Sequence, residues 1–169
     1  MTLHPLCSAP HVEIYYDTFN NWLFIDWEGD LTLDIVQRAC LEIARCYQQY
    51  AYPRVLNSNA QVTSFALDVA AWLASEFIPN LGVIGVEQVA WVVAPTVQGQ
   101  NGVIDTVKRL PETSFNLFDD VASAVAWLQQ IALPPSREGA PGLTAQSIER
   151  IQLIDNLLKQ HVLAPPVPA

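Results

Sequence analysis

Basic residues are scarce in this sequence. Its 169 residues include 8 Lys and Arg against 17 Asp and Glu, which gives a formal net charge of -9. Between Val55 and Val107 there is no Lys or Arg. Binding to nucleic acid or to an anionic membrane surface depends on a concentration of such residues, so the composition disfavours both kinds of partner.

Cysteine and long apolar runs are also lacking. The three cysteines, Cys7, Cys40 and Cys46, are widely spaced and form no CxxC pair, which argues against a disulfide scaffold or a zinc site. No uncharged stretch reaches the roughly 18 residues of a membrane-spanning helix, and the N-terminus does not have the pattern of a signal peptide. We therefore expect no membrane span and a reducing, cytoplasmic location.

The distribution of the 12 prolines predicts how the chain is divided. Eight of them lie near the two ends or in a Pro- and Gly-rich stretch, whereas the remaining four mark element boundaries in the body. We predict, in order, a tail over 1–12, a domain over 13–132, a linker over 133–142, an amphipathic helix over 143–163 and a tail over 164–169.

Within the body, the hydrophobic periodicity alternates between strand and helix. Aromatic and β-branched runs on either side of Asn20 and Asn21 predict an antiparallel hairpin. The predicted strands are 13–17, 22–28, 54–56, 86–94 and 114–118. The predicted helices are 32–50, 66–78, 101–110 and 121–132, with a polar loop over 57–64. This order predicts an α/β fold with a mixed, five-stranded sheet.

The predicted C-terminal helix carries an apolar stripe. Thr144 can cap it, and the stripe consists of Ile148, Ile151, Ile154, Leu158 and Val162. Such a stripe is buried either against the domain or against a second subunit, and the sequence leaves both open. Together with the apolar helix at 66–78, it leads us to expect a homodimer.

Six segments carry a resemblance to a known family. They are IYYD at 14–17, WLFIDWEG at 22–29, VLNSN at 55–59, AAWLASEFIPNL at 70–81, VAWVVAP at 89–95 and AVAWL at 124–128. The chain resembles, over about 13–132, the bacterial SpoIIAA-like or STAS-type domains, which are related in fold to the CRAL-TRIO lipid-binding domains. The resemblance implies a four-turn β/α superhelix and a regulatory module that binds a protein partner.

The resemblance also implies a phosphorylation site. In signalling members of the family, a partner kinase phosphorylates a Ser or Thr at the start of the helix after the third strand, and the same loop docks a protein. By position, Ser64 is the possible phosphoacceptor, with Thr63 next to it. The alternative is that Ser64 only caps the following helix.

Two groups of residues are candidates for binding. Asn57, Ser58 and Asn59, with Thr63 and Ser64, form a polar partner or ligand loop after a short apolar strand, although Asn and Ser also shape turns. The tryptophans are numerous, and those at 27, 72 and 91 could line a pocket for a lipid or another small apolar ligand. Ordinary core packing or a subunit interface would also account for Trp27, Trp72 and Trp91.

Catalytic groups do not come together in the sequence. Asp26 and Glu28 share one face of a strand and could meet Asp17 across the hairpin, but a solvated face is the commoner role for them. The three histidines lie outside the predicted core, and no phosphate-binding loop is present. We therefore expect no enzyme, metal or cofactor. The leading hypothesis is an interaction module that binds a protein through the 57–64 loop and the 66–78 helix, and the alternative is a binder of a small apolar ligand.

Overall fold

A single mixed sheet organises the chain, which we describe from a computed structural model. The structure describes residues 1–50, 52–82, 84–96, 115–131 and 145–162. In these residues the sheet has six strands in the order β1-β2-β3-β4-β5-β6, one more than the sequence predicts. The strands are β1 (Leu3–Ala9), β2 (Val12–Asp17), β3 (Trp22–Leu31), β4 (Arg54–Phe65), β5 (Gln88–Val92) and β6 (Phe115–Phe118).

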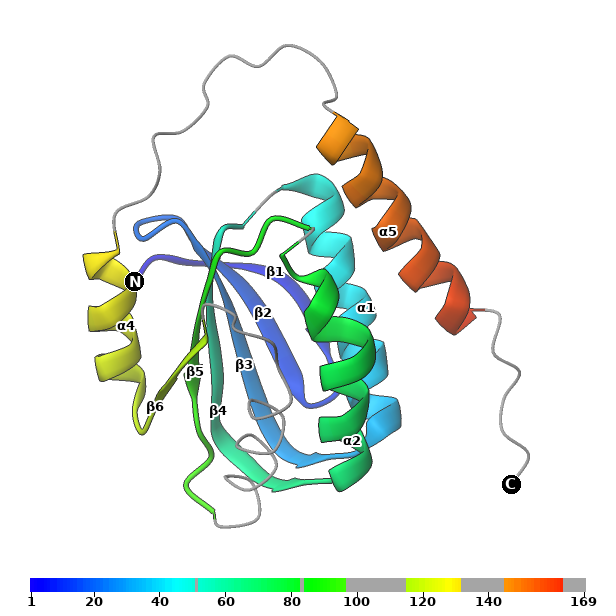
Figure 1. Cartoon of the computed structure of the whole chain (residues 1–169). Helices are drawn as coiled ribbons and strands as arrows, with labels where there is room; N and C mark the ends of the chain where they lie inside the picture. The colour runs from blue at the N-terminus through cyan, green and yellow to red at the C-terminus, as the bar shows by residue number, and fades with distance from the viewer. Residues whose placement is uncertain (51, 83, 97–114, 132–144, 163–169) are drawn as a thin grey trace.

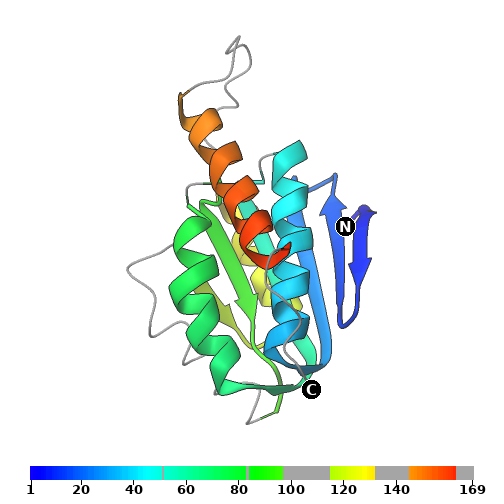
Figure 2. The same cartoon turned by 90° about the vertical axis from the view of Figure 1, so that its right-hand side faces the viewer.

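Helices pack on both faces of this sheet (Figure 1). They are α1 (Leu33–Gln49), α2 (Leu67–Trp72), α4 (Val121–Gln130) and α5 (Ala145–Val162). α1 and α2 lie on one face, α4 lies on the opposite face, and α5 lies outside α1 (Figure 2). Strands β1, β2 and β3 are antiparallel, whereas β3, β4, β5 and β6 pair in parallel. The predicted α/β class and the N-terminal hairpin are confirmed.

The hairpin and two helices begin as the sequence indicates. Asn21 has a φ of 56°, the left-handed conformation that Asn tolerates in tight turns. Asp120 is the N-cap of α4, and its carboxylate accepts a hydrogen bond of 2.8 Å from the Ser123 backbone N–H. Thr32 precedes α1 as predicted, but its side chain makes no capping bond.

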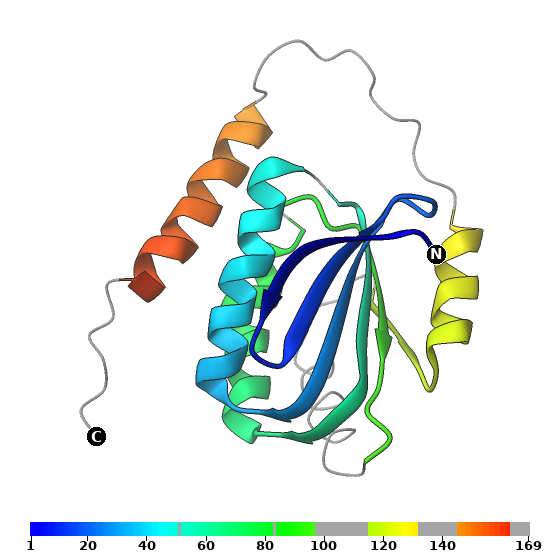
Figure 3. The same cartoon turned by 180° about the vertical axis from the view of Figure 1, so that it is seen from behind.

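Strand β1 replaces the tail predicted over 1–12. It forms the outer edge of the sheet beside β2, as the view from behind shows (Figure 3). Pro5 and Pro10 led to the wrong prediction, because proline usually interrupts a sheet. An edge strand tolerates proline, because on its open side there is no neighbouring strand that needs a backbone N–H donor. Most β1 side chains are exposed, so the strand also shows no burial pattern in the sequence.

Strand β4 replaces the predicted loop over 57–64. It is 12 residues long and runs beside β3, whose 10 residues provide a partner along nearly its whole length. The register shifts twice: Asp26 pairs with Ser58 but Glu28 with Gln61, and Gly29 pairs with Val62 but Asp30 with Ser64. Each shift places an extra β4 residue opposite β3, which is a β-bulge. The bulges break the alternation of side chains on which sequence-based strand prediction depends.

Helix α5 packs against α1 in the same chain. Ile154 is fully buried there as part of the main core. Ile148 and Ile151 are 45% and 42% exposed, so the predicted stripe is only partly covered in this chain. The helix predicted at 101–110, the linker 133–142 and the tail 164–169 lie outside the described residues, as do the side chains of Leu158 and Val162.

Candidate apolar cavity

A cavity of about 60 Å³ lies between the sheet and the helices of the α1/α2 face. A water molecule occupies roughly 10–15 Å³ measured in this way, so the space holds about four to six atoms of that size. On the sheet side it is lined by Ile25, Trp27, Asn57, Asn59, Val89 and Trp91. On the helix side it is lined by Val36, Cys40, Ile43, Tyr47, Phe77 and Ile78, among others. None of its described lining residues is charged.

The ordinary alternation of side chains along β4 brings Asn59 to this cavity. Val55, Asn57 and Asn59 alternate onto the α1/α2 face, while Leu56 packs on the α4 face. The first β4 bulge places Asn59 and Ala60 together opposite the single β3 residue Trp27. Asn59 is thus a polar side chain among apolar ones and lies at a bulge, a feature that is over-represented beside functional sites.

The helix that faces Asn59 is irregular too. The helix predicted over 66–78 forms as α2, followed by a π-helical turn (Leu73–Phe77) and a 3-10 turn (Ile78–Asn80). Leu73 and Phe77, the two buried residues of the π-helical turn, line the cavity. π-helical turns are rare and are found frequently at functional sites. Irregularities in both walls therefore meet at one place.

A directional chain of hydrogen bonds crosses the sheet side of the cavity. The Trp27 indole Nε1 donates to Asn57 Oδ1 at 2.9 Å, and Asn57 Nδ2 donates to Asn59 Oδ1 at 3.3 Å. An indole N–H can only donate, so it fixes the orientation of the Asn57 amide, which in turn fixes that of Asn59. The chain therefore ends on a donor, Asn59 Nδ2.

Two residues that line the cavity, Asn59 and Trp91, carry buried donors, Nδ2 and Nε1, that have no hydrogen-bond partner in the described part of the chain. The two residues are 1% and 5% exposed. Trp91 lies directly opposite Asn57 in the β4–β5 register. A buried donor without a partner costs about 1–3 kcal/mol, so a pair of them beside a cavity requires an explanation.

Two other buried donors, Trp22 Nε1 and Arg54 Nε, also have no partner among the described residues. They lie on the α4 face, and neither residue lines the cavity. The Arg54 guanidinium stands 5.5 Å from the centre of the Trp22 ring and donates to the Leu128 carbonyl at 2.9 Å. Sequence analysis missed this buried cation, because one Arg before an apolar run has no distinguishing pattern.

The structure brings four of the eight predicted site residues together at the cavity and leaves the other four outside it. Asn57, Asn59, Trp27 and Trp91 meet at the cavity. Trp72 stacks on Phe77 at 6.1 Å between ring centres and does not line the cavity. The remaining three residues, Ser58, Thr63 and Ser64, do not line it either.

Thr63 and Ser64 are bound to a carboxylate. Both hydroxyls donate to Asp30 Oδ1, the Ser64 bond measuring 2.9 Å. These two bonds hold the pKa of the Asp30 carboxyl below its ordinary value. Ser64 is not a helix cap, since it lies in β4 and Ala66 precedes α2. A phosphate on Ser64 would be repelled by Asp30, an arrangement that disfavours the predicted phosphorylation.

The acidic residues do not form the cluster that the sequence allowed. Asp17 is buried at the hairpin turn, where its carboxylate accepts bonds from Asn20 and from the Thr2 and Phe19 backbones. Asp26 lies farther along the sheet and is bonded to Ser58 and Gln61. The described residues contain no group of three His, Cys, Asp or Glu side chains that could hold a metal ion.

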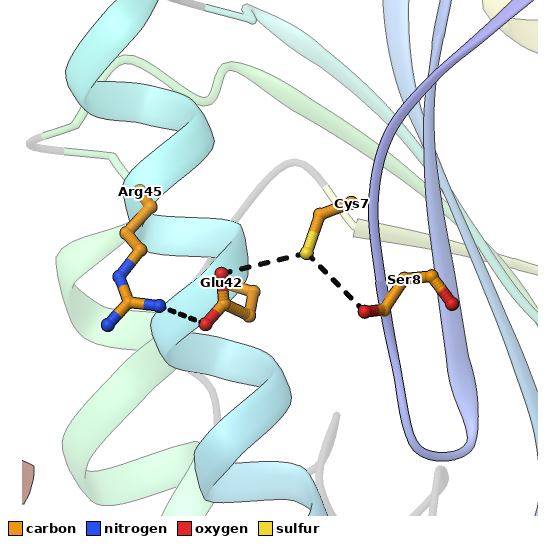
Figure 4. Close-up of polar contacts among 4 residues, drawn as sticks. All are labelled: Cys7, Ser8, Glu42 and Arg45. Atoms are coloured by element: carbon orange, nitrogen blue, oxygen red, sulfur yellow. Dashed lines mark hydrogen bonds and ion pairs between the residues drawn. The ribbon is translucent and has the colours of Figure 1, made fainter.

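A polar cluster connects edge strand β1 to α1 (Figure 4). The Cys7 thiol donates to Glu42 Oε2 at 3.6 Å and to the Ser8 carbonyl at 3.8 Å, while Glu42 pairs with Arg45. Burial and the neighbouring Glu42 carboxylate raise the pKa of Cys7, so its thiol stays protonated at neutral pH. Burial also raises the pKa of Cys40 and Cys46, the latter to about 11. All three free thiols are thus poor nucleophiles.

Comparisons with known proteins found no protein similar to this chain. No family model matches the chain, and neither the curated proteins nor the solved structures contain a match. No helix in the described residues has the length and apolarity needed to cross a membrane.

Proposed function

We propose that this protein binds a small, uncharged, mostly apolar molecule in the cavity of the α1/α2 face. The observation that carries the proposal is a cavity of about 60 Å³ whose wall is almost wholly apolar and contains no charged residue among those described. Protein cores otherwise pack to the density of organic crystals, so a space of this kind costs the protein stability.

The size and lining of the cavity restrict the ligand. Pockets for drug-sized ligands measure roughly 300–1,000 Å³, so a complete lipid chain would require the cavity to widen. An ion is also excluded as the ligand, because burying a charge without a counter-charge costs many kcal/mol and no described lining residue is charged.

Filling the cavity tests this function. Val89 lines the cavity, whereas Val92, on the same strand, packs on the α4 face. Val89→Ile should weaken binding of a probe of five non-hydrogen atoms, 2-methyl-1-butene, by at least severalfold, because the added methyl group takes up its space. Val92→Ile should leave the affinity unchanged. Titrations followed by the shifts of NMR methyl signals measure both affinities, and equal effects would contradict the proposal.

Protein binding, the leading hypothesis from the sequence, is our second proposal in modified form. Asn57 and Asn59 border the cavity, and Ser58 is buried, so they offer little surface to a partner. Leu67 at the start of α2 is 72% exposed, and Thr63, four residues earlier in the sequence, is exposed as well. These residues support a partner surface at this end of α2. The partly exposed stripe of α5 supports the proposed homodimer in the same way.

Membership of the SpoIIAA-like family also stays a proposal. The succession β3-α1-β4-α2-β5, with neighbouring parallel strands, is what two turns of a β/α superhelix would give. α4, on the opposite face, departs from that arrangement (Figure 1). If the α4 region unfolded in a separate step before the rest of the protein, this would support a superhelical unit that forms without α4.

A further inference from the structure

We propose that the cavity binds hydrocarbons in preference to polar molecules, and that a hydrogen-bond chain inside its wall sets this preference. The chain runs from Trp27 through Asn57 to Asn59. The inference rests on the proposed function and names the chemical class of its ligand. That ligand would be a short alkane or alkene, because a space of about 60 Å³ holds roughly four to six non-hydrogen atoms.

Polar side chains belong to the wall of the cavity, yet the surface that the wall presents is almost wholly apolar. Internal hydrogen bonds account for this. Asn57 Oδ1 accepts from Trp27 Nε1 at 2.9 Å, and Asn57 Nδ2 donates to Asn59 Oδ1 at 3.3 Å. Tyr47, which is fully buried, donates its hydroxyl to the Tyr52 carbonyl at 3.2 Å. These groups are therefore bonded within the protein and are not offered to a ligand.

The two donors without a described partner do not change the character of this wall. Asn59 Nδ2 and Trp91 Nε1 are buried atoms with almost no accessible surface, so neither offers a hydrogen bond to a ligand in the cavity. The thiol of Cys40, which also lines the cavity, is at most a weak donor. A hydroxyl or carbonyl group in the cavity would lose its bonds to water without replacement. This cost distinguishes polar molecules from hydrocarbons of the same shape.

Two pairs of probes with matched shapes test the preference on the unmodified protein. In 2-butanone an oxygen replaces the terminal CH₂ of 2-methyl-1-butene, and in 2-butanol a hydroxyl replaces a methyl group of 2-methylbutane. We expect each polar probe to bind about 5- to 150-fold more weakly than its hydrocarbon partner, the loss expected for a polar group buried without a hydrogen bond. Shifts of the Val89 methyl signals in NMR titrations measure the affinities. The methyl signals of Val92, on the α4 face, are the control and should not move.

A pair of matched variants tests the role of the chain. Trp27→Phe removes the indole N–H that bonds to Asn57 Oδ1, so an unpaired acceptor is left beside the space that the indole vacates. Trp91→Phe makes the same change in the same wall, but Trp91 Nε1 has no described partner, so no acceptor is released.

The preference for 2-methylbutane over 2-butanol should fall about three- to tenfold in Trp27→Phe, because the alcohol can donate to the released acceptor. It should stay unchanged in Trp91→Phe. The ketone 2-butanone has no donor and should gain nothing in either variant. In the unmodified protein, the Trp27 indole N–H signal should move no more with 2-butanol than with 2-methylbutane, because its bond to Asn57 is kept.

The outcomes separate this inference from the proposed function. If the hydrocarbons bind but either polar probe binds the unmodified protein as tightly as its partner, the hydrocarbon class is wrong while the cavity function stands. If Trp27→Phe and Trp91→Phe change the preference equally, or if 2-butanol displaces the Trp27 signal selectively, the chain does not set the preference. Failure of all the probes to bind would overturn the proposed function together with this inference.

Discussion

The two faces of the sheet are packed by different means. The α4 face carries a small core in which Ala90 and Ala124 allow close approach of helix and sheet around Trp22. The α1/α2 face carries the larger core, yet it contains the cavity, a bulged strand and a π-helical turn. The larger of the two cores is therefore the one that contains the cavity. If the proposed function holds, the α1/α2 face gives up some stability for a binding space, and the α4 face does not.

The largest test of this contrast compares two leucines. Leu128→Ala on the α4 face should lower the free energy of unfolding by about 3–5 kcal/mol, because a fully buried side chain loses contacts on all sides. Leu73→Ala should cost only about 2 kcal/mol, since Leu73 already borders the cavity and has fewer contacts to lose. Urea unfolding of both variants measures the difference, and equal costs would show that the faces are equally packed.

Small-to-large substitutions should produce the opposite order. Val92→Ile overfills the α4 face and should destabilise the protein by about 1–3 kcal/mol. Val89→Ile fills part of the cavity and should stabilise it by about 0.5–2 kcal/mol. The variants share a strand and a substitution, so strand propensity cancels. Destabilisation by both, measured by urea unfolding, would mean that the cavity cannot accept a methyl group.

The sequence predicts the regular parts of the molecule well. The hairpin around Asn21, the helix after Thr32 and the cap at Asp120 depend on local geometry, and local geometry can be read from neighbouring residues. Strand β1 could not be predicted because its side chains are mostly exposed and show no strand pattern, and most of β4 could not because it is held in place by pairing with β3, which is distant in sequence. Pro5 and the polar run after Leu56 indicate loops when taken alone.

The candidate site could be predicted only in part. The abundance of tryptophan pointed to Trp27 and Trp91, and the polar run pointed to Asn57 and Asn59. That these four residues belong to one site depends on the register of three strands, and no local signal gives that register. Trp72 was wrongly grouped with them, because helical periodicity does not distinguish a ring that lines a cavity from one that stacks outside it.

The smallest expected effects concern two carboxyls outside the cavity, whose pKa values move in opposite directions. Burial alone would raise the pKa of Asp17, but the bonds from Asn20, Thr2 and Phe19 outweigh it and lower the pKa. For Asp26, burial outweighs the bonds from Ser58 and Gln61, so the pKa is raised. The two pKa values move in opposite directions because the Asp17 carboxylate accepts more hydrogen bonds than the Asp26 carboxylate does.

The pH dependence of stability should show this difference. The stabilisation by Asp17 is complete above the unfolded pKa of about 3.9 and is lost as the pH falls through the lower, folded value. The stabilisation by protonated Asp26 is complete below about pH 3.9 and is lost as the pH rises through the higher, folded value. Urea unfolding between about pH 3 and pH 7 should therefore show that Asp17→Asn removes part of the acid sensitivity. Asp26→Asn should instead remove a decline in stability above about pH 4. If both substitutions changed the pH dependence of the free energy of unfolding in the same direction, the assigned directions of the pKa shifts would be wrong.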